Sequence, residues 1–382
     1  MRVGIDITAA IYDRGVSRYT TNLVRALAQR GDVELRLYGA SWRQKDRLEH
    51  FAHQICSHAP ERHHAHIQTL PPKAQEILWN TLRMNPVRSL FPDTEVFHSW
   101  DWLQPPDKDL PLVSTIHDMA IMKFPETAHP TILKMHQRAW KELKARRAQI
   151  IAVSQATKQD VVELLGFEPS DVHVVYEALP TETISSIHEI SEEQHNVLKA
   201  KLALSKPFIL CVGTREPRKN LRRAIEAWWP LRGEYELIVA GEAGWDESDE
   251  LAEALQSPEL RFLGKVTERE LKVLYSEAAL LLYPSLYEGF GLPILEAFYF
   301  GTPVVTSNTS SMPEVAGNAA ELVSPESIES IRQGIFNVLN EGSEARSLRL
   351  QKMTIRLQLF DWQRVAEETA KVYRRAIQAH QG

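Results

Sequence analysis

The segment Ser285–Gly301 carries two carboxylates, Glu288 and Glu296, eight positions apart around a glycine-containing turn. An apolar run with the composition of a buried strand precedes the turn, and Pro293 suits a first helical position. Glu288 is therefore expected in a strand-to-helix turn. Ligands of open α/β sheets bind at the carboxyl ends of strands, and the N–H groups at a helix start attract anions. The segment predicts a site for a phosphorylated ligand.

A second candidate segment, Gly213–Asn220, contains Arg215, Arg218 and Lys219 between an apolar run and the expected start of a helix. Three cations within five residues suit a diphosphate, because positioned Arg and Lys groups stabilise its negative charge. The alternative is a solvated basic loop that follows a strand. For Arg215 the two interpretations stay open.

The elements expected to position these residues alternate between strand-like runs and helix-period segments. The alternation restarts after a polar stretch, Thr181–Lys206, which predicts two successive α/β units, each with a parallel sheet covered by helices on both faces. An amphipathic helix is expected over Phe360–Ile377. The expected strands are 2–6, 33–38, 95–98, 112–117 and 150–153, then 208–212, 236–240, 261–263, 279–283 and 303–307.

The composition fits a globular protein with two or more domains. The chain has 382 residues, of which 43% are hydrophobic and 25% charged. Its net charge of −6 provides no overall basic field for nucleic acid. The start of the chain lacks the features of a secretory signal, and no window approaches the ~18 apolar residues of a membrane span, so we expect a cytoplasmic protein. Two cysteines, Cys56 and Cys211, provide neither a disulfide framework nor a zinc-finger spacing.

The paired glutamates and their accompanying segments resemble the retaining glycosyltransferases of family 4, whose signature is two glutamates separated by seven residues. The resemblance implies an α/β protein with the GT-B fold, in which two Rossmann-like domains face each other across a cleft. It implies an acceptor domain at 1–180, a linker at 181–204, a donor domain at 205–358 and a C-terminal helix at about 360–382 that packs back on the first domain. The matching segments are Gly15–Leu27, His117-Asp118, Ile150–Ser154, Val212–Leu221, Phe262–Tyr275 and Gly301–Val323.

The resemblance also implies roles for residues of the donor domain. Arg218 and Lys219 are expected to bind the phosphates and stabilise the departing diphosphate, and Glu288 to lie beside the transferred sugar. Glu296, expected in the first turn of its helix, would hold the ribose of the nucleotide. The backbone amides of the turn would face sugar and phosphate, and the 264–267 segment would contact the base. These backbone contacts are assigned to Phe290, Gly291, Leu292 and Val266.

In the first domain the resemblance assigns His117 to hexose binding or transition-state support, with a structural histidine as the alternative. The segment Asp13–Tyr19, which includes Gly15 and Val16, suits a glycine loop that approaches the phosphate or the acceptor. It departs from the commoner pattern of the family because Ser17 takes the place of a second glycine. We also expect His98 near the acceptor, as a candidate of second rank.

The implied activity is transfer of a hexose with retention of configuration, by a front-face route in which the leaving phosphate accepts the proton of the acceptor. The donor is expected to be a nucleotide-diphosphate sugar, GDP-mannose before others, and the acceptor a glycan or lipid-linked oligosaccharide of a bacterial surface polysaccharide. No cofactor and no metal ion are expected, because the cationic loop supplies the electrostatic stabilisation of a metal. The alternatives are a nucleotide-sugar epimerase on the same fold and a non-catalytic glycan-binding subunit.

Two basic and apolar segments, Thr131–Arg147 and Pro71–Phe91, suggest peripheral contact with an anionic membrane at its inner face. A solvated face on a core-packed helix is the alternative for the first of them. Six histidines crowd residues 50 to 66, where we expect a polar surface loop, because their spacing fixes no metal geometry.

Overall fold

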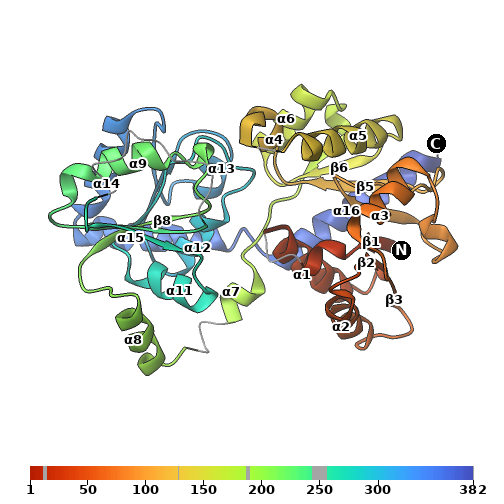
Figure 1. Ribbon diagram of the computed structural model, residues 1–382, viewed down its shortest axis with the longest axis horizontal. Helices are drawn as coiled ribbons and strands as arrows, with labels where there is room; N and C mark the ends of the chain where they lie inside the picture. Colours follow the sequence, from red (N-terminus) through yellow and green to blue (C-terminus); the bar gives the residue numbers. More distant parts are fainter. Residues whose placement is uncertain (12–14, 128, 186–189, 243–255, 382) are drawn as a thin grey trace. The chain divides into compact units, whose positions relative to one another are not determined.

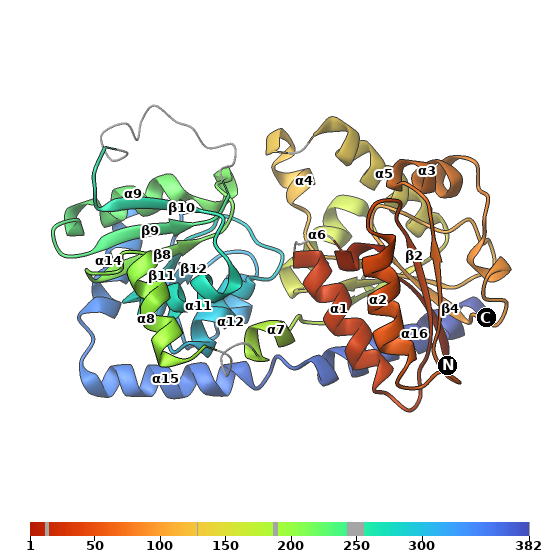
Figure 2. The ribbon, with the colours of Figure 1, turned by 60° about the horizontal axis from the view of Figure 1, so that its bottom comes forward.

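The computed structural model describes residues 1–11, 15–127, 129–185, 190–242 and 256–381 of the chain. It divides into two compact units, the first formed by Met1–Pro180 with Asp361–Gly382 and the second by Thr181–Phe360. Each unit contains one parallel sheet with its own helices (Figures 1 and 2).

The described part of the first unit contains a seven-stranded parallel sheet with the order β3-β2-β1-β4-β5-β6-β7. Helices α5 and α6 cover one face, and α1 and α16 cover the other (Figure 1). The strands β4 and β5 are buried along their whole length, as expected for a sheet covered on both faces. The strands are β1 (Arg2–Asp6), β2 (Glu34–Ala40), β3 (His64–Gln68), β4 (Val96–Trp100), β5 (Leu112–Ile116), β6 (Gln149–Ala152) and β7 (Val172–Val174). The helices are η1 (Thr8–Ile11), α1 (Gly15–Ala28), α2 (Lys45–Cys56), α3 (Pro72–Glu76), the π-helix η2 (Ile77–Thr81), η3 (Val87–Ser89), α4 (Ala120–Lys123), η4 (Pro125–Thr127), α5 (Pro130–Ala145), α6 (Gln155–Leu165), η5 (Pro169–Asp171) and α16 (Trp362–Gln381).

The described part of the second unit contains a six-stranded parallel sheet with the order β10-β9-β8-β11-β12-β13. In both units the strand order reverses beside the first strand, between β1 and β4 and between β8 and β11, as in doubly wound nucleotide-binding sheets. Ligands of such sheets bind at the carboxyl ends of the strands at this reversal. The strands are β8 (Phe208–Val212), β9 (Glu236–Ala240), β10 (Leu260–Gly264), β11 (Leu280–Tyr283), β12 (Val304–Ser307) and β13 (Glu321–Val323). The helices are α7 (Thr181–Ser185), α8 (Glu192–Lys201), η6 (Pro217–Lys219), α9 (Leu221–Trp228), η7 (Trp229–Leu231), α11 (Glu268–Glu277), α12 (Leu292–Tyr299), α13 (Met312–Ala316), α14 (Ile328–Leu339) and α15 (Ser343–Leu357).

The predicted α/β alternation is confirmed, and each expected strand lies within two residues of an observed one. Two expectations about irregular segments are wrong. The polar stretch expected to be a linker contains α7 and α8 and belongs to the second unit, where His195 and Lys199 of α8 both contact Glu277 of α11. Most of the histidine-rich stretch is regular structure rather than a loop: His50 and His53 lie in α2 and His64 and His66 in β3, and only residues 57–63 between them are irregular. His63, which precedes β3, is buried and accepts a hydrogen bond from the backbone N–H of Leu35.

His98, expected near the acceptor as a candidate of second rank, is not available to a ligand, because its side chain is fully buried and both ring nitrogens have partners inside the first unit. Nδ1 lies 2.7 Å from the hydroxyl of Tyr373 on α16, and Nε2 lies 2.8 Å from the hydroxyl of Thr115 on β5. Burial, together with the charge of His117, lowers the pKa of His98 to about 3. His98 therefore attaches the C-terminal helix to the sheet.

The burial of His98 predicts acid sensitivity of the fold. The unfolded chain protonates this imidazole below its ordinary pKa near 6.5, whereas the folded chain resists protonation down to about pH 3. Stability is therefore lost as the pH falls through this window, by up to about 1.4 kcal/mol per pH unit. We expect the free energy of unfolding of His98→Gln to fall less steeply between pH 7 and pH 5 than that of the wild type. His66→Gln, at an exposed position of β3, is the control; an unchanged slope in His98→Gln would contradict the assignment.

Among the described residues, no helix is long and apolar enough to cross a membrane.

Candidate active site

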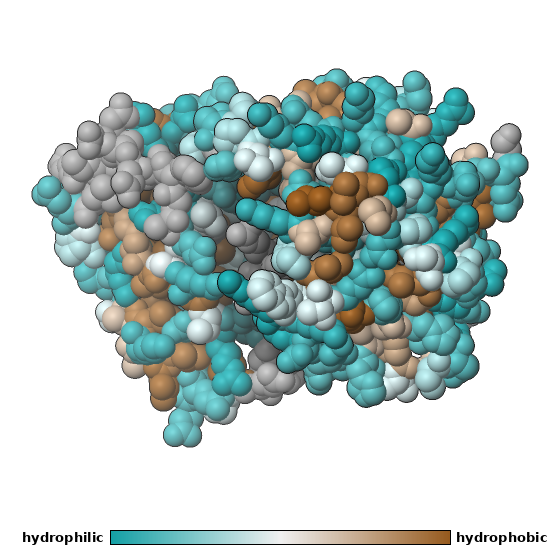
Figure 3. Space-filling model, turned by 45° about the vertical axis from the view of Figure 1, so that its right-hand side comes forward, coloured by the Kyte–Doolittle hydropathy of each residue, from teal (hydrophilic) through white to brown (hydrophobic). Residues whose placement is uncertain are grey.

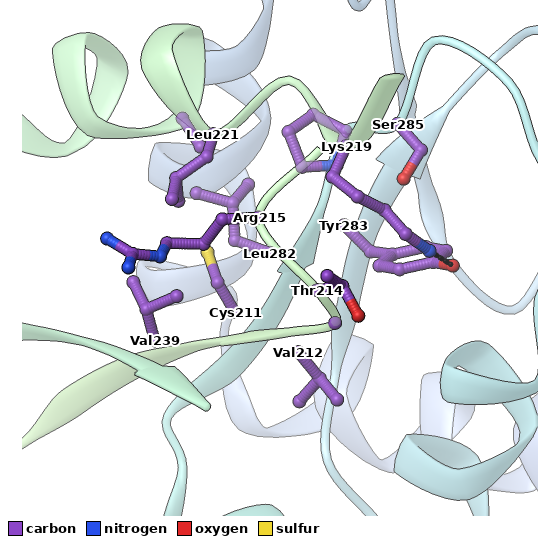
Figure 4. Close-up of a pocket in the computed structure, with 13 residues that line it drawn as sticks. Cys211, Val212, Thr214, Arg215, Lys219, Leu221, Val239, Leu282, Tyr283 and Ser285 are labelled. Atoms are coloured by element: carbon purple, nitrogen blue, oxygen red, sulfur yellow. Dashed lines mark hydrogen bonds between the residues drawn. The ribbon is translucent and has the colours of Figure 1, made fainter. Parts of the chain in front are cut away.

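The candidate active site lies where the strand order of the second unit reverses. After β8 the chain turns through Gly213 and Thr214 into η6, and after β11 it turns through Pro284 and Ser285 toward α12. These two turns line one pocket together with Lys219 (Figure 4). The position is the one at which an open parallel sheet binds its ligand.

Three predicted residues meet at this point. Glu288 accepts hydrogen bonds from both predicted phosphate ligands, through Oε2 from Nη1 of Arg218 at 2.7 Å and through Oε1 from Nζ of Lys219 at 2.6 Å. Lys219 also donates to the hydroxyl of Tyr283 at 3.1 Å, and Figure 4 shows its side chain reaching across the pocket to that residue. Arg218 has a second carboxylate partner, Glu216, at 2.8 Å. We call Arg218, Lys219 and Glu288 the charged cluster.

Burial and neighbouring charges act against each other on the pKa values of Glu288 and Lys219. Burial acts to raise the pKa of Glu288, but the charges of Lys219 and Arg218 outweigh it and lower this pKa to about 2. Burial likewise acts on Lys219 and lowers its pKa below the ordinary value, although Glu288 opposes the shift. With Glu216 included, two cations face two carboxylates. A diphosphate that enters the pocket would compete with Glu288 for the cations.

Hydroxyl groups after β12 hold the turn that carries Glu288. Ser310 and Ser311 both donate to the carbonyl oxygen of Glu288, at 2.7 and 2.9 Å, and Ser311 also lies 2.7 Å from the carbonyl oxygen of Phe290. Gly291 precedes α12 with φ at +112°, a conformation that L side chains rarely adopt. The hydroxyls of Ser310 and Ser311 and the backbone conformation of Gly291 therefore hold this turn in place without a ligand.

Glu296 lies in the second turn of α12, so the expectation that it lies in the first turn is wrong. The helix begins at Leu292, one residue earlier than Pro293 indicates. Glu296 is buried and accepts a hydrogen bond of 2.7 Å from the hydroxyl of Tyr275 on α11. The first amides of α12 follow Phe290 and Gly291, and the first N–H groups of a helix have no partner within it. The predicted contact residues Phe290, Gly291 and Leu292 thus surround this helix start.

Arg215 and Val266 lie on neighbouring turns of the same unit. The guanidinium of Arg215 stacks over the ring of Phe262 on β10, 5.1 Å from its centroid, and points away from Lys219 in Figure 4. Val266 lies between β10 and α11, next to Thr267, which caps α11 by a reciprocal pair of hydrogen bonds with Glu270. Arg215 therefore lines the same pocket as Lys219 but contacts Phe262, whereas both cations of the charged cluster contact Glu288.

Close contact between two turns explains why the chain has glycine at position 241, directly after β9. A Cβ at Gly241 would lie 1.9 Å from the carbonyl oxygen of Gly213, and φ at position 241 is +156°. We expect Gly241→Ala to lower the free energy of unfolding by about 3 kcal/mol or more, because backbone atoms must move. Urea denaturation would measure this. Gly233→Ala, where a Cβ meets nothing within 4 Å, should change stability by less than about 1 kcal/mol; equal effects would contradict the explanation.

His117 lies in the first unit, directly after β5. Its Nδ1 is 2.8 Å from a carboxylate oxygen of Glu177. Burial acts to lower the pKa of His117, but the Glu177 carboxylate outweighs it and the pKa is raised. Nε2 is buried and has no hydrogen-bond partner among the described residues. An imidazole oriented by a carboxylate, with its other nitrogen unsatisfied, is suited to bind a ligand hydroxyl.

Gly15 and Val16 form the first residues of α1, so this part of the segment expected to be a glycine loop is helical. A Cβ at Gly15 would meet nothing within 4 Å, so packing does not require glycine there. The hydroxyl of Ser17 donates to the carbonyl oxygen of Ala10 at 2.8 Å and so links η1 to α1. Asp13, in the same predicted loop, lies outside the described residues.

Three residues close to His117, namely Asp101, Trp102 and His136, were not among the candidates predicted from the sequence. Asp101 and Trp102 directly follow β4, and His136 of α5 lies with its Nδ1 3.3 Å from Asp101. Asp101 and Trp102 could have been found from the sequence, because a polar and an aromatic residue directly after a buried strand are candidates for a ligand site. No signal pointed to His136, since its place depends on how α5 packs.

Two models of known protein families match the chain. The family model described as "Glycosyltransferase Family 4" matches residues 14–183, and the model described as "Glycosyl transferases group 1" matches residues 193–352. The chain belongs to glycosyltransferase family 4. The first match includes His117, and the second includes both cations of the charged cluster and both glutamates of this family 4 glycosyltransferase.

Similar proteins include mannosyltransferases. O-antigen chain mannosyltransferase B of Escherichia coli is 29% identical over 375 residues, which are 94% of this family 4 glycosyltransferase and 96% of that protein. Serotype-specific mannosyltransferase WbdA of Escherichia coli is 31% identical over 245 residues, which are 62% of this chain and 30% of that longer protein. The crystal structure of WaaG, a glycosyltransferase involved in lipopolysaccharide biosynthesis, is similar with a TM-score of 0.67 at 17% identity, covering 97% of this chain and 98% of that one. The predicted GT-B fold, with two Rossmann-like domains, is confirmed.

Proposed function

We propose that this family 4 glycosyltransferase moves mannose from GDP-mannose to a glycan or lipid-linked oligosaccharide of a bacterial surface polysaccharide, with retention of configuration. The observation that carries the proposal is the charged cluster at the strand reversal of the second unit. Similarity to an O-antigen chain mannosyltransferase and a serotype-specific mannosyltransferase supports mannose among the hexoses and O-antigen among the products. The donor is a substrate, and no cofactor is proposed.

The charged cluster suits a pyrophosphate that gains charge as it leaves. Arg218 and Lys219 are already brought together by Glu288 before a ligand arrives, and the diphosphate of the donor would replace Glu288 as their partner. As the bond to the sugar breaks, negative charge grows on the β-phosphate and both cations stabilise it more strongly. Glu296 would accept hydrogen bonds from the hydroxyls of the ribose. The helix start at Gly291 would face the phosphates.

The state of Glu288 argues against a role as nucleophile. Both of its oxygens accept hydrogen bonds from cations, and its pKa is lowered to about 2. Such a carboxylate is weakly basic, whereas double displacement needs a carboxylate free to attack the anomeric carbon. We therefore favour a front-face route, in which the leaving phosphate accepts the proton of the acceptor hydroxyl while Glu288 remains beside the sugar. His117 would bind the hexose through Nε2.

The proposed function is tested by hydrolysis of the donor without an acceptor. We expect slow release of GDP from GDP-mannose that exceeds release of nucleoside diphosphate from UDP-glucose, GDP-fucose and dTDP-rhamnose. Formation of an epimeric nucleotide sugar without release of diphosphate would favour the epimerase. Failure of calorimetric titration to detect binding of any nucleotide would favour a non-catalytic glycan-binding subunit.

Independence from metal ions is a second expected result, because the two cations supply the charge that a divalent ion provides elsewhere. Turnover measured after treatment with EDTA should remain within about twofold of the untreated rate. Complete loss of activity that Mg²⁺ or Mn²⁺ restores would contradict this expectation. Within the described ranges, no group of three His, Cys, Asp or Glu side chains is arranged to hold a metal ion.

We further propose that the protein acts in the cytoplasm, in peripheral contact with an anionic membrane. The two candidate segments are neighbours, because Arg83 forms an ion pair of 2.6 Å with Glu142 of α5. Ile77, Leu82 and Met84 are each more than half exposed, and on the face drawn in Figure 3 apolar residues gather in several patches among hydrophilic ones. Sedimentation with phosphatidylglycerol vesicles should exceed sedimentation with neutral vesicles; no binding to either would remove the proposal.

A further inference from the structure

A second histidine–carboxylate pair lies beside His117 on the carboxyl edge of the first sheet. His136 of α5 places Nδ1 3.3 Å from Oδ2 of Asp101, and the same oxygen accepts a hydrogen bond of 3.4 Å from the indole N–H of Trp140. Asp101 is buried, and burial acts to lower the pKa of His136, but the charge of Asp101 outweighs it and the pKa is raised. The carboxylate and the imidazole thus lie within ion-pair distance, although Nδ1 of His136 makes no hydrogen bond among the described residues.

His136 is partly accessible. Its Nδ1 is buried, and the side chain as a whole is 15% exposed. The ring of Trp102 lies beside it, with 6.2 Å between the ring centroids, and Trp102 is only partly buried. The apolar face of the Trp102 ring and the polar imidazole of His136 therefore lie next to each other.

Hydrogen bonds and ring contacts hold the turn that carries Asp101 and Trp102. The side-chain amide of Gln104 donates to the carbonyl oxygen of Trp100 at 2.7 Å, and the hydroxyl of Ser99 lies 2.5 Å from the Gln104 side-chain oxygen. The rings of Trp100 and Trp102 are stacked at 6.1 Å, and the indole N–H of Trp100 donates to the carbonyl oxygen of Asp6 on β1. The site is thus positioned by β1 and β4, the two strands between which the order of the first sheet reverses.

The two histidine–carboxylate pairs belong to one cluster. Rings connect them in the order His117, Trp100, Trp102 and His136, with neighbouring centroids 6.1 to 6.3 Å apart. The charge of Asp101 also acts on His117. Ligand groups that reach His117 and His136 at the same time would therefore lie on adjacent parts of one surface of the first unit.

We propose that Trp102 and His136 form a subsite for the terminal sugar ring of the acceptor glycan, with Asp101 as the positioning residue. A pyranose ring offers an apolar face of C–H groups, which stacks on an indole, and hydroxyls at its rim, which exchange hydrogen bonds with an imidazole. The inference rests on the proposed transferase function and specifies its acceptor: recognition is of a saccharide end rather than of a lipid chain alone.

Direct binding to the whole protein tests the subsite without requiring turnover. The probes are the methyl α-glycosides of mannose, glucose, galactose, rhamnose and N-acetylglucosamine, measured by saturation-transfer NMR at millimolar concentration. We expect at least one to bind the wild type, and Trp102→Ala and His136→Gln to weaken that binding about tenfold or more. Trp102→Phe should restore it to within about threefold, because the ring face remains. Asp101→Asn should give a smaller loss than His136→Gln.

Two further measurements separate the subsite from the donor site and from the fold. Acceptor-independent release of GDP from GDP-mannose should stay within about twofold of wild type in Trp102→Ala and His136→Gln, and His66→Gln, on the exposed part of β3, should change neither property. If no glycoside binds the wild type, if binding is equal in the variants, or if GDP release falls in parallel with binding, the proposal is wrong. Absence of GDP release from the wild type itself would instead refute the proposed function.

Discussion

Lys219→Ala is expected to lower kcat for mannose transfer by about 10²- to 10³-fold, the usual cost of removing one positioned group that stabilises charge in a transition state. The ammonium group lies 2.6 Å from Glu288 and 3.1 Å from the hydroxyl of Tyr283, inside the pocket between β8 and β11. It is therefore placed where charge on the β-phosphate would grow. Initial rates of GDP release at saturating GDP-mannose provide the measurement.

The variant also leaves the buried Glu288 with Arg218 as its remaining partner in the charged cluster. Some loss of stability is expected, so the rate must be measured on protein whose unfolding transition remains above the assay temperature. Lys206→Ala, at an exposed position of the same unit, is the matched control and should leave kcat unchanged. A folded Lys219→Ala enzyme with at least a third of the wild-type kcat would contradict the role of Lys219.

Glu288→Gln and Glu296→Gln are expected to have opposite effects on the affinity for GDP. Glu288 holds Lys219 and Arg218 when no ligand is present, and Glu216 holds Arg218 as well. Glu288→Gln removes a negative charge that competes with the diphosphate for these cations, so GDP should bind at least as tightly as to the wild type. Transfer should nevertheless fall by about 10²-fold, because the group beside the sugar and the orientation of both cations are lost.

Glu296→Gln should weaken GDP binding about tenfold, because a charge-assisted hydrogen bond to a ribose hydroxyl becomes a neutral one. The substitution preserves the shape of the side chain and an oxygen for the hydroxyl of Tyr275. Isothermal titration of GDP into both variants gives the comparison. If Glu288→Gln loses more GDP affinity than Glu296→Gln, the assignment of the two glutamates is wrong.

The charged cluster could be predicted from the sequence because local rules place it. β8 and β11 are short apolar runs followed by turns, and parallel strands that lie side by side bring their carboxyl ends together. Arg218, Lys219 and Glu288 therefore meet even though they come from segments 69 and 70 positions apart. The start of α12 was missed by one residue, because Gly291 at positive φ, rather than Pro293, marks its beginning.

Features that depend on distant packing could not be predicted. The edge strands β3, β7 and β13 are short or polar and lack the apolar run of a central strand. His98 resembled a site residue because it lies near the end of a strand, but Tyr373, 275 positions away, occupies one of its nitrogens. His136 meets Asp101 through the packing of α5 on the sheet. Neither contact leaves a pattern in the local sequence.

The most direct test of the account is a crystal structure of the protein with bound GDP. The account predicts that the β-phosphate lies within hydrogen-bond distance of Lys219 Nζ and Arg218, that Glu288 no longer holds both cations, and that Glu296 contacts the ribose. A diphosphate bound away from the turns after β8 and β11, with the contacts of Lys219 and Arg218 to Glu288 unchanged, would contradict it.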